Sequence, residues 1–250
     1  MKLSLLTLCM TNIFLSFCSD VSQLSKQEKT ETMTPQTTNK DDNTDEVDPG
    51  SFISHIAKPS KIRMFWKRNG QVIKTLEKLK EVEPQLVFAM NGGMFTEDYA
   101  PVGLYVEDGK QLKSIKKVNN PKVNFGIQPQ GVFLVRDDKA EVVPLQKYRD
   151  EGVVYATQSA PMVVVDSVIN PNIPQGNSRT IRNGVGILPN GNVLLACSKE
   201  FVTFKEFAAY FLSKGCNNAL YLDGGVSRTS KGGGFGFSRS GFGVMIGVMK

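Results

Sequence analysis

Three strand-like runs of this 250-residue chain end in glycine and in polar side chains that could bind a ligand. LVFAM is followed by Asn91-Gly92-Gly93, YAT by Gln158-Ser159-Ala160-Pro161, and ALYL by Asp223-Gly224-Gly225. Glycine pairs remove side chains where a ligand or another backbone must come close, and they permit positive φ angles that turn amides toward a cavity. An ordinary tight turn explains any single one of these places equally well. Three of them in one chain favour a binding or catalytic site.

Two arginines supply positive charge for such a site. Arg179 and Arg182 stand three residues apart, just before the strand-like run GVGIL. The planar guanidinium presents a fork of donors that suits phosphate or carboxylate. Two solvated arginines in a surface loop are the alternative interpretation, which the residues alone leave open.

Other groups that could do chemistry are few. Glu97 and Asp98 follow Asn91-Gly92-Gly93 closely enough that one of them could supply a second carboxylate. His55 is the only histidine and lies before the glycine-rich places, so a Ser-His-Asp hydrolase and a histidine-based zinc site are disfavoured. No cofactor is indicated. A calcium or magnesium site built from carboxylates and carbonyls stays open, although no loop has the spacing of a known calcium motif.

These residues need a sheet to position them, and many short strands with few helices predict an α+β domain over residues 51–250. We expect a mixed, largely antiparallel sheet core with a few flanking helices. Asn69-Gly70 and Pro189-Asn190-Gly191 predict hairpin turns, and the helices are predicted at Thr75 to Val82 and Thr203 to Leu212. The predicted strands are residues 86–90, 101–106, 131–135, 153–156, 162–165, 185–188, 193–197, 220–222 and 242–248.

Two cysteines of this domain, Cys197 and Cys216, are predicted to be reduced and buried. A helix of about twelve residues between them would separate the two positions by roughly 18 Å. A disulfide needs Cα atoms within about 7 Å.

The first residues resemble an export signal. Met1-Lys2 is followed by an apolar run from Leu3 to Phe17 and then by Cys18. About fifteen apolar residues are too few for a comfortable membrane span. Residues 1–18 are therefore predicted to be a lipoprotein-type signal with lipidation at Cys18. Phe17 departs from the small residue usual before such a cysteine, so plain secretion and an uncleaved anchor stay open.

Residues 19–50 are predicted to be a disordered polar tether. They contain almost no large apolar side chain and cannot bury enough surface to offset the entropy of ordering. As a flexible coil they would span on the order of 30 Å. The expected location is the periplasm or cell envelope, with the domain tethered to a membrane through Cys18.

The charge balance does not predict a nucleic-acid-binding protein. The chain has a formal net charge of +6 and a pI near 9.1. Its basic residues are scattered and form no recognisable RNA- or DNA-binding module. A mildly basic surface suits an anionic substrate or an anionic envelope, and its default interpretation is a solvated face. We expect a monomer whose partner is a small-molecule or glycan substrate.

Several short motifs follow one another in a definite order along the chain: NGGMF (91–95), PVGLYVEDG (101–109), NF (124–125) with GVF (131–133), QSAPM (158–162), RNGVG (182–186) and ALYLDGGVS (219–227). In this order they resemble the phosphodiester glycosidase family, which includes N-acetylglucosamine-1-phosphodiester alpha-N-acetylglucosaminidase. The resemblance covers nearly everything from about Phe88 to Lys250. Many relatives carry further glycine and serine where this chain has Gly224-Gly225-Val226-Ser227-Arg228, so the substrate does not transfer.

The resemblance implies hydrolysis of a sugar-1-phosphodiester between the anomeric carbon and the phosphate oxygen. Glycosyl cleavage passes through an oxocarbenium-like transition state and normally uses two carboxyl groups. Phosphate is already a good leaving group, so a cation can stand in for the acid. Asp223 is expected to act as nucleophile, base or stabiliser of the sugar cation. Arg182 is the first candidate for the cation and Arg179 the second, and Asn91 would hold a sugar hydroxyl or the phosphate.

Further residues are expected to contact the substrate, and two alternative functions stay open. One alternative is an envelope lipoprotein that binds glycan or phosphate without catalysis. The other is glycosyl transfer to an envelope acceptor. The expected substrate contacts are Gly92, Gly93, Gln158, Ser159, Arg179, Asn183, Gly224, Gly225 and Ser227.

Overall fold

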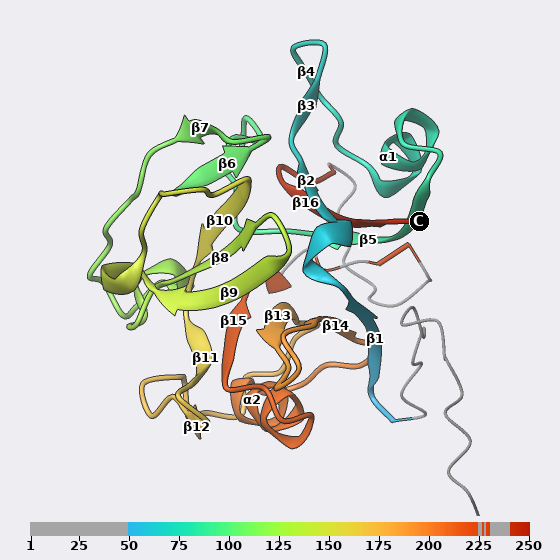
Figure 1. Cartoon of the computed structure of the whole chain (residues 1–250). Helices are drawn as coiled ribbons and strands as arrows, with labels where there is room; N and C mark the ends of the chain where they lie inside the picture. Colours follow the sequence, from blue (N-terminus) through green and yellow to red (C-terminus); the bar gives the residue numbers. More distant parts are fainter. Residues whose placement is uncertain (1–49, 225–226, 228, 231–240) are drawn as a thin grey trace, which may run out of the picture. The chain divides into compact units, whose positions relative to one another are not determined.

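The computed structural model describes residues 50–224, 227, 229–230 and 241–250 (Figure 1). The predicted signal at residues 1–18, the tether up to residue 49, Gly225 and Arg228 lie outside these ranges. From residue 50 onward the described residues belong to one compact unit. Every pair of strands described within it is antiparallel.

The largest sheet has six strands and is covered on one face by helix α2 (Phe204–Ser213). Thr203 caps this helix and forms a capping box with Glu206. Gly184 lets the helix approach the sheet backbone, because a Cβ there would lie 2.8 Å from the Phe207 ring. In sheet order, the strands are β1 (Phe52–Ala57), β14 (Val193–Ser198), β13 (Asn183–Ile187), β15 (Asn218–Tyr221), β11 (Met162–Val165) and β12 (Val168–Ile169).

A second sheet has five strands, and its edge strand β7 is short and exposed. One of its faces joins the main core, and the other packs against side chains around Leu145 and Tyr148. In sheet order, the strands are β7 (Lys110–Lys113), β6 (Tyr105–Glu107), β10 (Tyr155–Ser159), β8 (Gly131–Arg136) and β9 (Lys139–Pro144).

The third sheet contains β2 (Ile62–Phe65), β16 (Met245–Met249) and β5 (Leu86–Asn91), with β16 in the middle. Helix α1 (Leu76–Val82) begins after its cap Thr75 and packs Leu76 and Leu79 against this sheet. The remaining elements are the hairpin of β3 (Lys67–Arg68) and β4 (Gln71–Val72), and three short 3-10 helices, η1 (Pro59–Lys61), η2 (Asn124–Gly126) and η3 (Leu145–Lys147).

The main hydrophobic core lies where the three sheets meet. It contains residues from each sheet, among them Phe88, Phe133 and Leu220. Packing the inner faces of several sheets against one another removes their apolar residues from water. This burial is the main favourable contribution to the free energy of folding. The predicted α+β class is confirmed.

The fold confirms two local predictions and corrects a third. The Asn69-Gly70 hairpin is confirmed, and both residues have positive φ (52° and 78°), as a type I′ turn requires. The predicted strand at 101–106 begins only at Tyr105. The Leu104 carbonyl still accepts from the Gln158 N–H of β10 at 2.9 Å, but the Leu104 N–H donates to the Gln158 side chain at 3.0 Å. Cys197 and Cys216 are free and buried, as predicted, and burial raises the pKa of each thiol to about 12.

No helix among the described residues is long and apolar enough to cross a membrane.

Candidate active site

Ends of strands from all three sheets meet around Asp223. Asn91 is the last residue of β5, Ser159 is the last of β10, and Asn183 is the first of β13. β13 runs antiparallel to β15, so the first residue of β13 lies beside the last residues of β15. The Leu222 N–H accordingly donates to the Asn183 carbonyl at 3.0 Å. The chain leaves β15 at this point and continues into Asp223 and Gly224.

Asn183 is the centre of the polar contacts here. Its side chain is fully buried, and its Nδ2 donates to the carbonyl of Asn91 at 2.7 Å. Its Oδ1 accepts from the backbone N–H of Asp223 and from the hydroxyl of Ser227, both at 3.0 Å. One buried amide therefore joins the third sheet to the turn that carries Asp223.

The carbonyl side of Asp223 is held as well. Asn91 is buried, and its Nδ2 donates to the Asp223 carbonyl at 3.0 Å. The Ser227 hydroxyl also lies 2.9 Å from this carbonyl, and the Ser159 hydroxyl donates to the carbonyl of Leu222 at 2.9 Å. Both backbone groups of Asp223 thus have buried side-chain partners. This leaves a half-buried carboxylate on a turn whose main chain is fixed.

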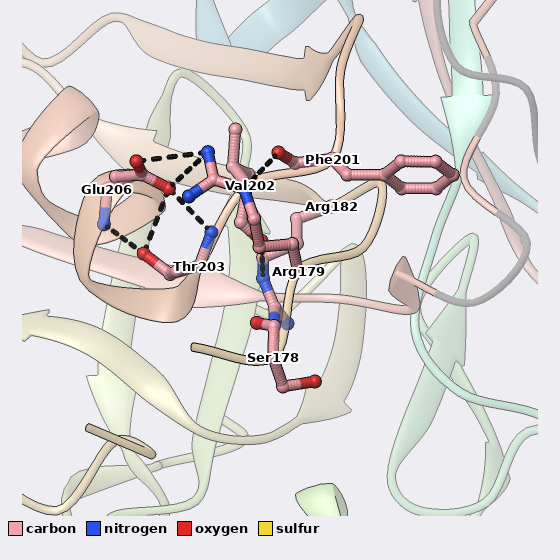
Figure 2. A network of polar contacts seen from close by, with 7 residues as sticks. All are labelled: Ser178, Arg179, Arg182, Phe201, Val202, Thr203 and Glu206. Atoms are coloured by element: carbon pink, nitrogen blue, oxygen red, sulfur yellow. Dashed lines mark hydrogen bonds and ion pairs between the residues drawn. The ribbon is translucent and has the colours of Figure 1, made fainter. Parts of the chain in front are cut away.

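Arg182 is buried one residue before Asn183, with 3 % of its surface exposed. Its Nε donates to the Val202 carbonyl at 3.0 Å and its Nη2 to the Ser178 carbonyl at 3.4 Å (Figure 2). Its guanidinium carbon lies 3.7 Å from the centre of the Phe204 ring. Burial lowers the pKa of this group, and Tyr221 raises it, but a guanidinium remains charged in proteins. The structure therefore keeps a cation in aromatic surroundings beside the end of β15.

Tyr221, which is not among the site residues predicted from the sequence, connects this cation to the Asp223 turn. Its buried hydroxyl accepts from the Gly224 N–H at 2.8 Å and interacts with the Arg182 guanidinium. Burial and the nearby charge of Asp223 raise the pKa of Tyr221 to about 12, so the phenol is neutral at physiological pH. A tyrosine two residues before the aspartate was a usable signal, because a buried phenol needs a hydrogen-bond partner.

Tyr221→Phe is expected to lower the kcat of the sugar-1-phosphodiester hydrolysis expected from the sequence by about tenfold. The substitution leaves the Gly224 N–H without its acceptor and loosens the turn beside Asp223. The ring contacts with Phe204 and Phe207 should survive, so the free energy of unfolding should fall only by the cost of one buried N–H left without a partner, about 1 to 3 kcal/mol. Steady-state kinetics and urea unfolding measure the two effects. Tyr148→Phe, which removes a buried hydroxyl elsewhere, is the control. Wild-type kcat in Tyr221→Phe would exclude a positioning role.

Arg179 lies apart from these contacts. It is half exposed, its Nη2 is 3.0 Å from Glu206 Oε2, and its Nε donates to the Phe201 carbonyl at 3.0 Å. Figure 2 shows this pair beside the capping box of α2. The sequence analysis named Arg182 as the first candidate for the cation and Arg179 as the second. The structure places Arg179 at the start of α2 and Arg182 beside Tyr221.

Gln158 and the described glycines also have structural partners. The Gln158 Oε1 accepts from the backbone N–H groups of Leu104 and Lys116, both at 3.0 Å, and its Nε2 donates to the Lys116 carbonyl at 2.7 Å. Gly92, Gly93 and Gly224 stand where other chain segments come close. A Cβ added at Gly92 would lie 2.8 Å from Val244, and one added at Gly93 would lie 2.6 Å from Thr157. A Cβ added at Gly224 would lie 2.3 Å from the Tyr221 hydroxyl.

The two carboxylates considered as a second catalytic group are on the surface. Glu97 and Asp98 are exposed in the turn after β5. The Thr96 hydroxyl donates to Asp98 and lowers its pKa, whereas a general acid needs a raised pKa. The described contacts of Asp223 include neither residue.

His55 is buried in β1 and stacks on Phe88, with ring centres 4.8 Å apart, and burial lowers its pKa to about 4. Within the described ranges, no group of three or more His, Cys, Asp or Glu side chains is placed to hold a metal ion.

Two comparisons relate the sequence of this chain to known proteins. The family model for phosphodiester glycosidases matches residues 84–235. The uncharacterized protein YigE of Escherichia coli (strain K12) is 39 % identical over 196 residues, which is 75 % of this chain and 77 % of that protein.

Two solved structures share the fold. The catalytic domain of zebrafish N-acetylglucosamine-1-phosphodiester alpha-N-acetylglucosaminidase, auto-inhibited by its pro-peptide, matches with a TM-score of 0.59 and 14 % identity, over 83 % of this chain and 81 % of that one. A hypothetical protein from Synechocystis matches with a TM-score of 0.52 and 13 % identity, over 80 % of this chain and 59 % of that one. The family match, which spans more than half of the chain, carries the assignment: the chain belongs to the phosphodiester glycosidase family.

Proposed function

We propose that the protein hydrolyses a sugar-1-phosphodiester of the N-acetylglucosamine-1-phosphodiester type. One observation carries the proposal: buried asparagines from two sheets hold the main chain on both sides of Asp223. Such an arrangement fixes a carboxylate against a bound sugar, as stabilisation of an oxocarbenium-like transition state requires. Family membership supports a hydrolase of this kind.

In the proposed reaction, the bond between the anomeric carbon and the phosphate oxygen breaks. Asp223 faces the anomeric carbon as nucleophile, base or stabiliser, and water supplies the new hydroxyl of the sugar. The phosphate leaves with the bonding electron pair, as a monoester. Arg182 stabilises its charge, because a fixed cation in a site with little water acts more strongly than one in bulk solvent. Asn91 and Asn183 act as positioning residues for Asp223.

We place this activity in the cell envelope, in glycan or exopolysaccharide metabolism. The support is the signal-like start of the chain with Cys18, followed by a polar stretch suited to a tether.

The two arginines provide the test. Arg182→Ala is expected to lower kcat/KM for an N-acetylglucosamine-1-phosphodiester by about a hundredfold, the effect of removing one group that stabilises developing charge. Arg179→Ala is the matched control and should stay within about twofold, because an exposed ion pair contributes little. Sugar release by the purified chain measures both variants, and urea unfolding checks that each is folded.

Equal activities of the two variants would contradict the role of Arg182. Saturable binding of the phosphodiester by the wild-type chain with no product would contradict hydrolysis and favour the non-catalytic binding protein. Transfer of the sugar to an added alcohol in place of water would identify a transglycosylase.

A further inference from the structure

The segment Lys110–Val123 combines positive charge with exposed apolar side chains. It has five lysines, at positions 110, 113, 116, 117 and 122, and no acidic residue. Leu112, Ile115 and Val123 are 46 %, 40 % and 47 % exposed, and they are three of the six large hydrophobic residues exposed in the described part of the chain. Scattered exposed hydrophobics are ordinary, whereas a cluster of them on a basic segment indicates an interaction surface.

Glutamine side chains hold the backbone of this segment in place. Gln158 pairs with both the N–H and the carbonyl of Lys116, as described above. Gln130 Oε1 accepts from the Val118 N–H at 3.3 Å, and Gln128 Nε2 donates to the Val118 carbonyl at 2.9 Å. Gln158 and Gln130 are themselves buried. The segment lacks a regular ladder after β7, yet the fold fixes its path and thereby keeps its lysines and apolar side chains at the surface.

The location suits contact with a large partner. β7 is one of the two edge strands of the five-stranded sheet, and the segment continues from it along the outside of that sheet (Figure 1). Beside it lies a cavity of ≈ 680 Å³, lined by Ile115, Lys117, Val118, Gln128, Gln130 and Leu145 among others. A cavity of this size with one cationic and several amide side chains can admit an anionic headgroup, with apolar side chains next to it.

Charge alone would fit any polyanion, but the exposed apolar side chains favour a bilayer. Lysines attract the anionic headgroups of a membrane, while neighbouring apolar residues enter the boundary between headgroups and acyl chains. A water-soluble polyanion would leave Leu112, Ile115 and Val123 exposed to solvent. We propose that Lys110–Val123 is a docking surface for a bilayer that contains anionic phospholipid. This surface is separate from the contacts around Asp223 and does not depend on the proposed hydrolysis.

The test compares two double variants of the full chain. Lys117→Glu with Lys122→Glu changes the proposed surface, and Lys80→Glu with Lys205→Glu makes the same change of charge at exposed positions on α1 and α2. Because residues 1–49 are the same in every protein, they contribute equally to membrane binding. Co-sedimentation with vesicles of phosphatidylcholine mixed with phosphatidylglycerol, and with vesicles of phosphatidylcholine alone, measures the partition coefficient. Thermal unfolding confirms that each variant is folded.

Each lysine close to an anionic membrane contributes a factor of about five to binding. The Lys117/Lys122 variant should therefore bind the anionic vesicles at least about 25-fold more weakly than wild type. The binding of the Lys80/Lys205 variant should fall by a much smaller factor. Leu112→Asn with Ile115→Asn should also weaken binding to these vesicles, by several-fold. Equal losses in the two lysine variants would overturn the proposal. A second combination of results would also overturn it: the Leu112 and Ile115 substitutions leave vesicle binding unchanged, and the Lys117/Lys122 variant binds soluble polyphosphate more weakly than wild type. This combination would identify a polyanion site.

Discussion

Asp223→Asn is expected to lower the kcat of sugar-1-phosphodiester hydrolysis by about a thousandfold, within the range for loss of a positioned acid–base group. The substitution keeps the shape of the side chain but removes the negative charge that stabilises the sugar cation. The contacts of Asp223 with Asn91 and Asn183 are made by its main chain and should persist. The free energy of unfolding should then change by less than about 1 kcal/mol.

The measurement is single-turnover and steady-state release of sugar from an N-acetylglucosamine-1-phosphodiester, with urea unfolding of the same preparations. Asp138→Asn is the matched control, because Asp138 is exposed in the turn between β8 and β9. Its kcat should equal that of wild type. A folded Asp223→Asn protein with substantial turnover would show that the carboxylate is dispensable, and the mechanism would have to be abandoned.

Asn183→Ala should produce the largest loss of stability among the changes considered for this site. It removes the acceptor for the Asp223 N–H and the donor for the Asn91 carbonyl, both of which lie in a buried network. Each buried group left without a partner costs about 1 to 3 kcal/mol. With a small cavity added, the free energy of unfolding should fall by about 3 to 5 kcal/mol. Activity should fall too, since the Asp223 turn loses one of its two anchors.

Urea unfolding followed by tryptophan fluorescence measures this loss, because Trp66 is buried in the core. Asn119→Ala removes an exposed asparagine from the surface and should change the free energy of unfolding by less than about 0.5 kcal/mol. If Asn183→Ala were no less stable than Asn119→Ala, the contacts of the Asn183 side chain would contribute nothing net, and its central place in the site would be wrong.

The sequence predicted the local features of the fold because these depend on neighbouring residues. The spacing of apolar residues in Thr203 to Leu212 predicts α2, and Asn69-Gly70 predicts the hairpin. The division of the strands among three sheets could not be predicted in this way. An apolar run such as LVFAM shows that a strand is buried, but it carries no information about which distant strand pairs with it.

The candidate site was predicted in outline, because strands that end in Asn-Gly-Gly and Asp-Gly-Gly mark turns that need special backbone geometry. The roles of individual residues could not be read from residue type. Gln158 could bind a sugar as readily as a backbone, and only the fold shows that Leu104 and Lys116 occupy its amide. Arg179 and Arg182 look alike in sequence. Their environments differ because Phe204 and Tyr221, which come from later elements, surround only Arg182.

The middle strand of the third sheet also governs when the site can form during synthesis. β16 pairs with β5 along its length and with β2, whose residues are made about 180 positions earlier. A ribosome therefore has to pass residue 249 before β5 gains this neighbour and Asn91 reaches its final position. Pairing over such a separation in sequence is slow. A chain truncated shortly before residue 245 would contain Asp223, Arg182 and Asn183. It would lack β16, the strand that holds Asn91 beside them, so we expect translation products of this length to be inactive.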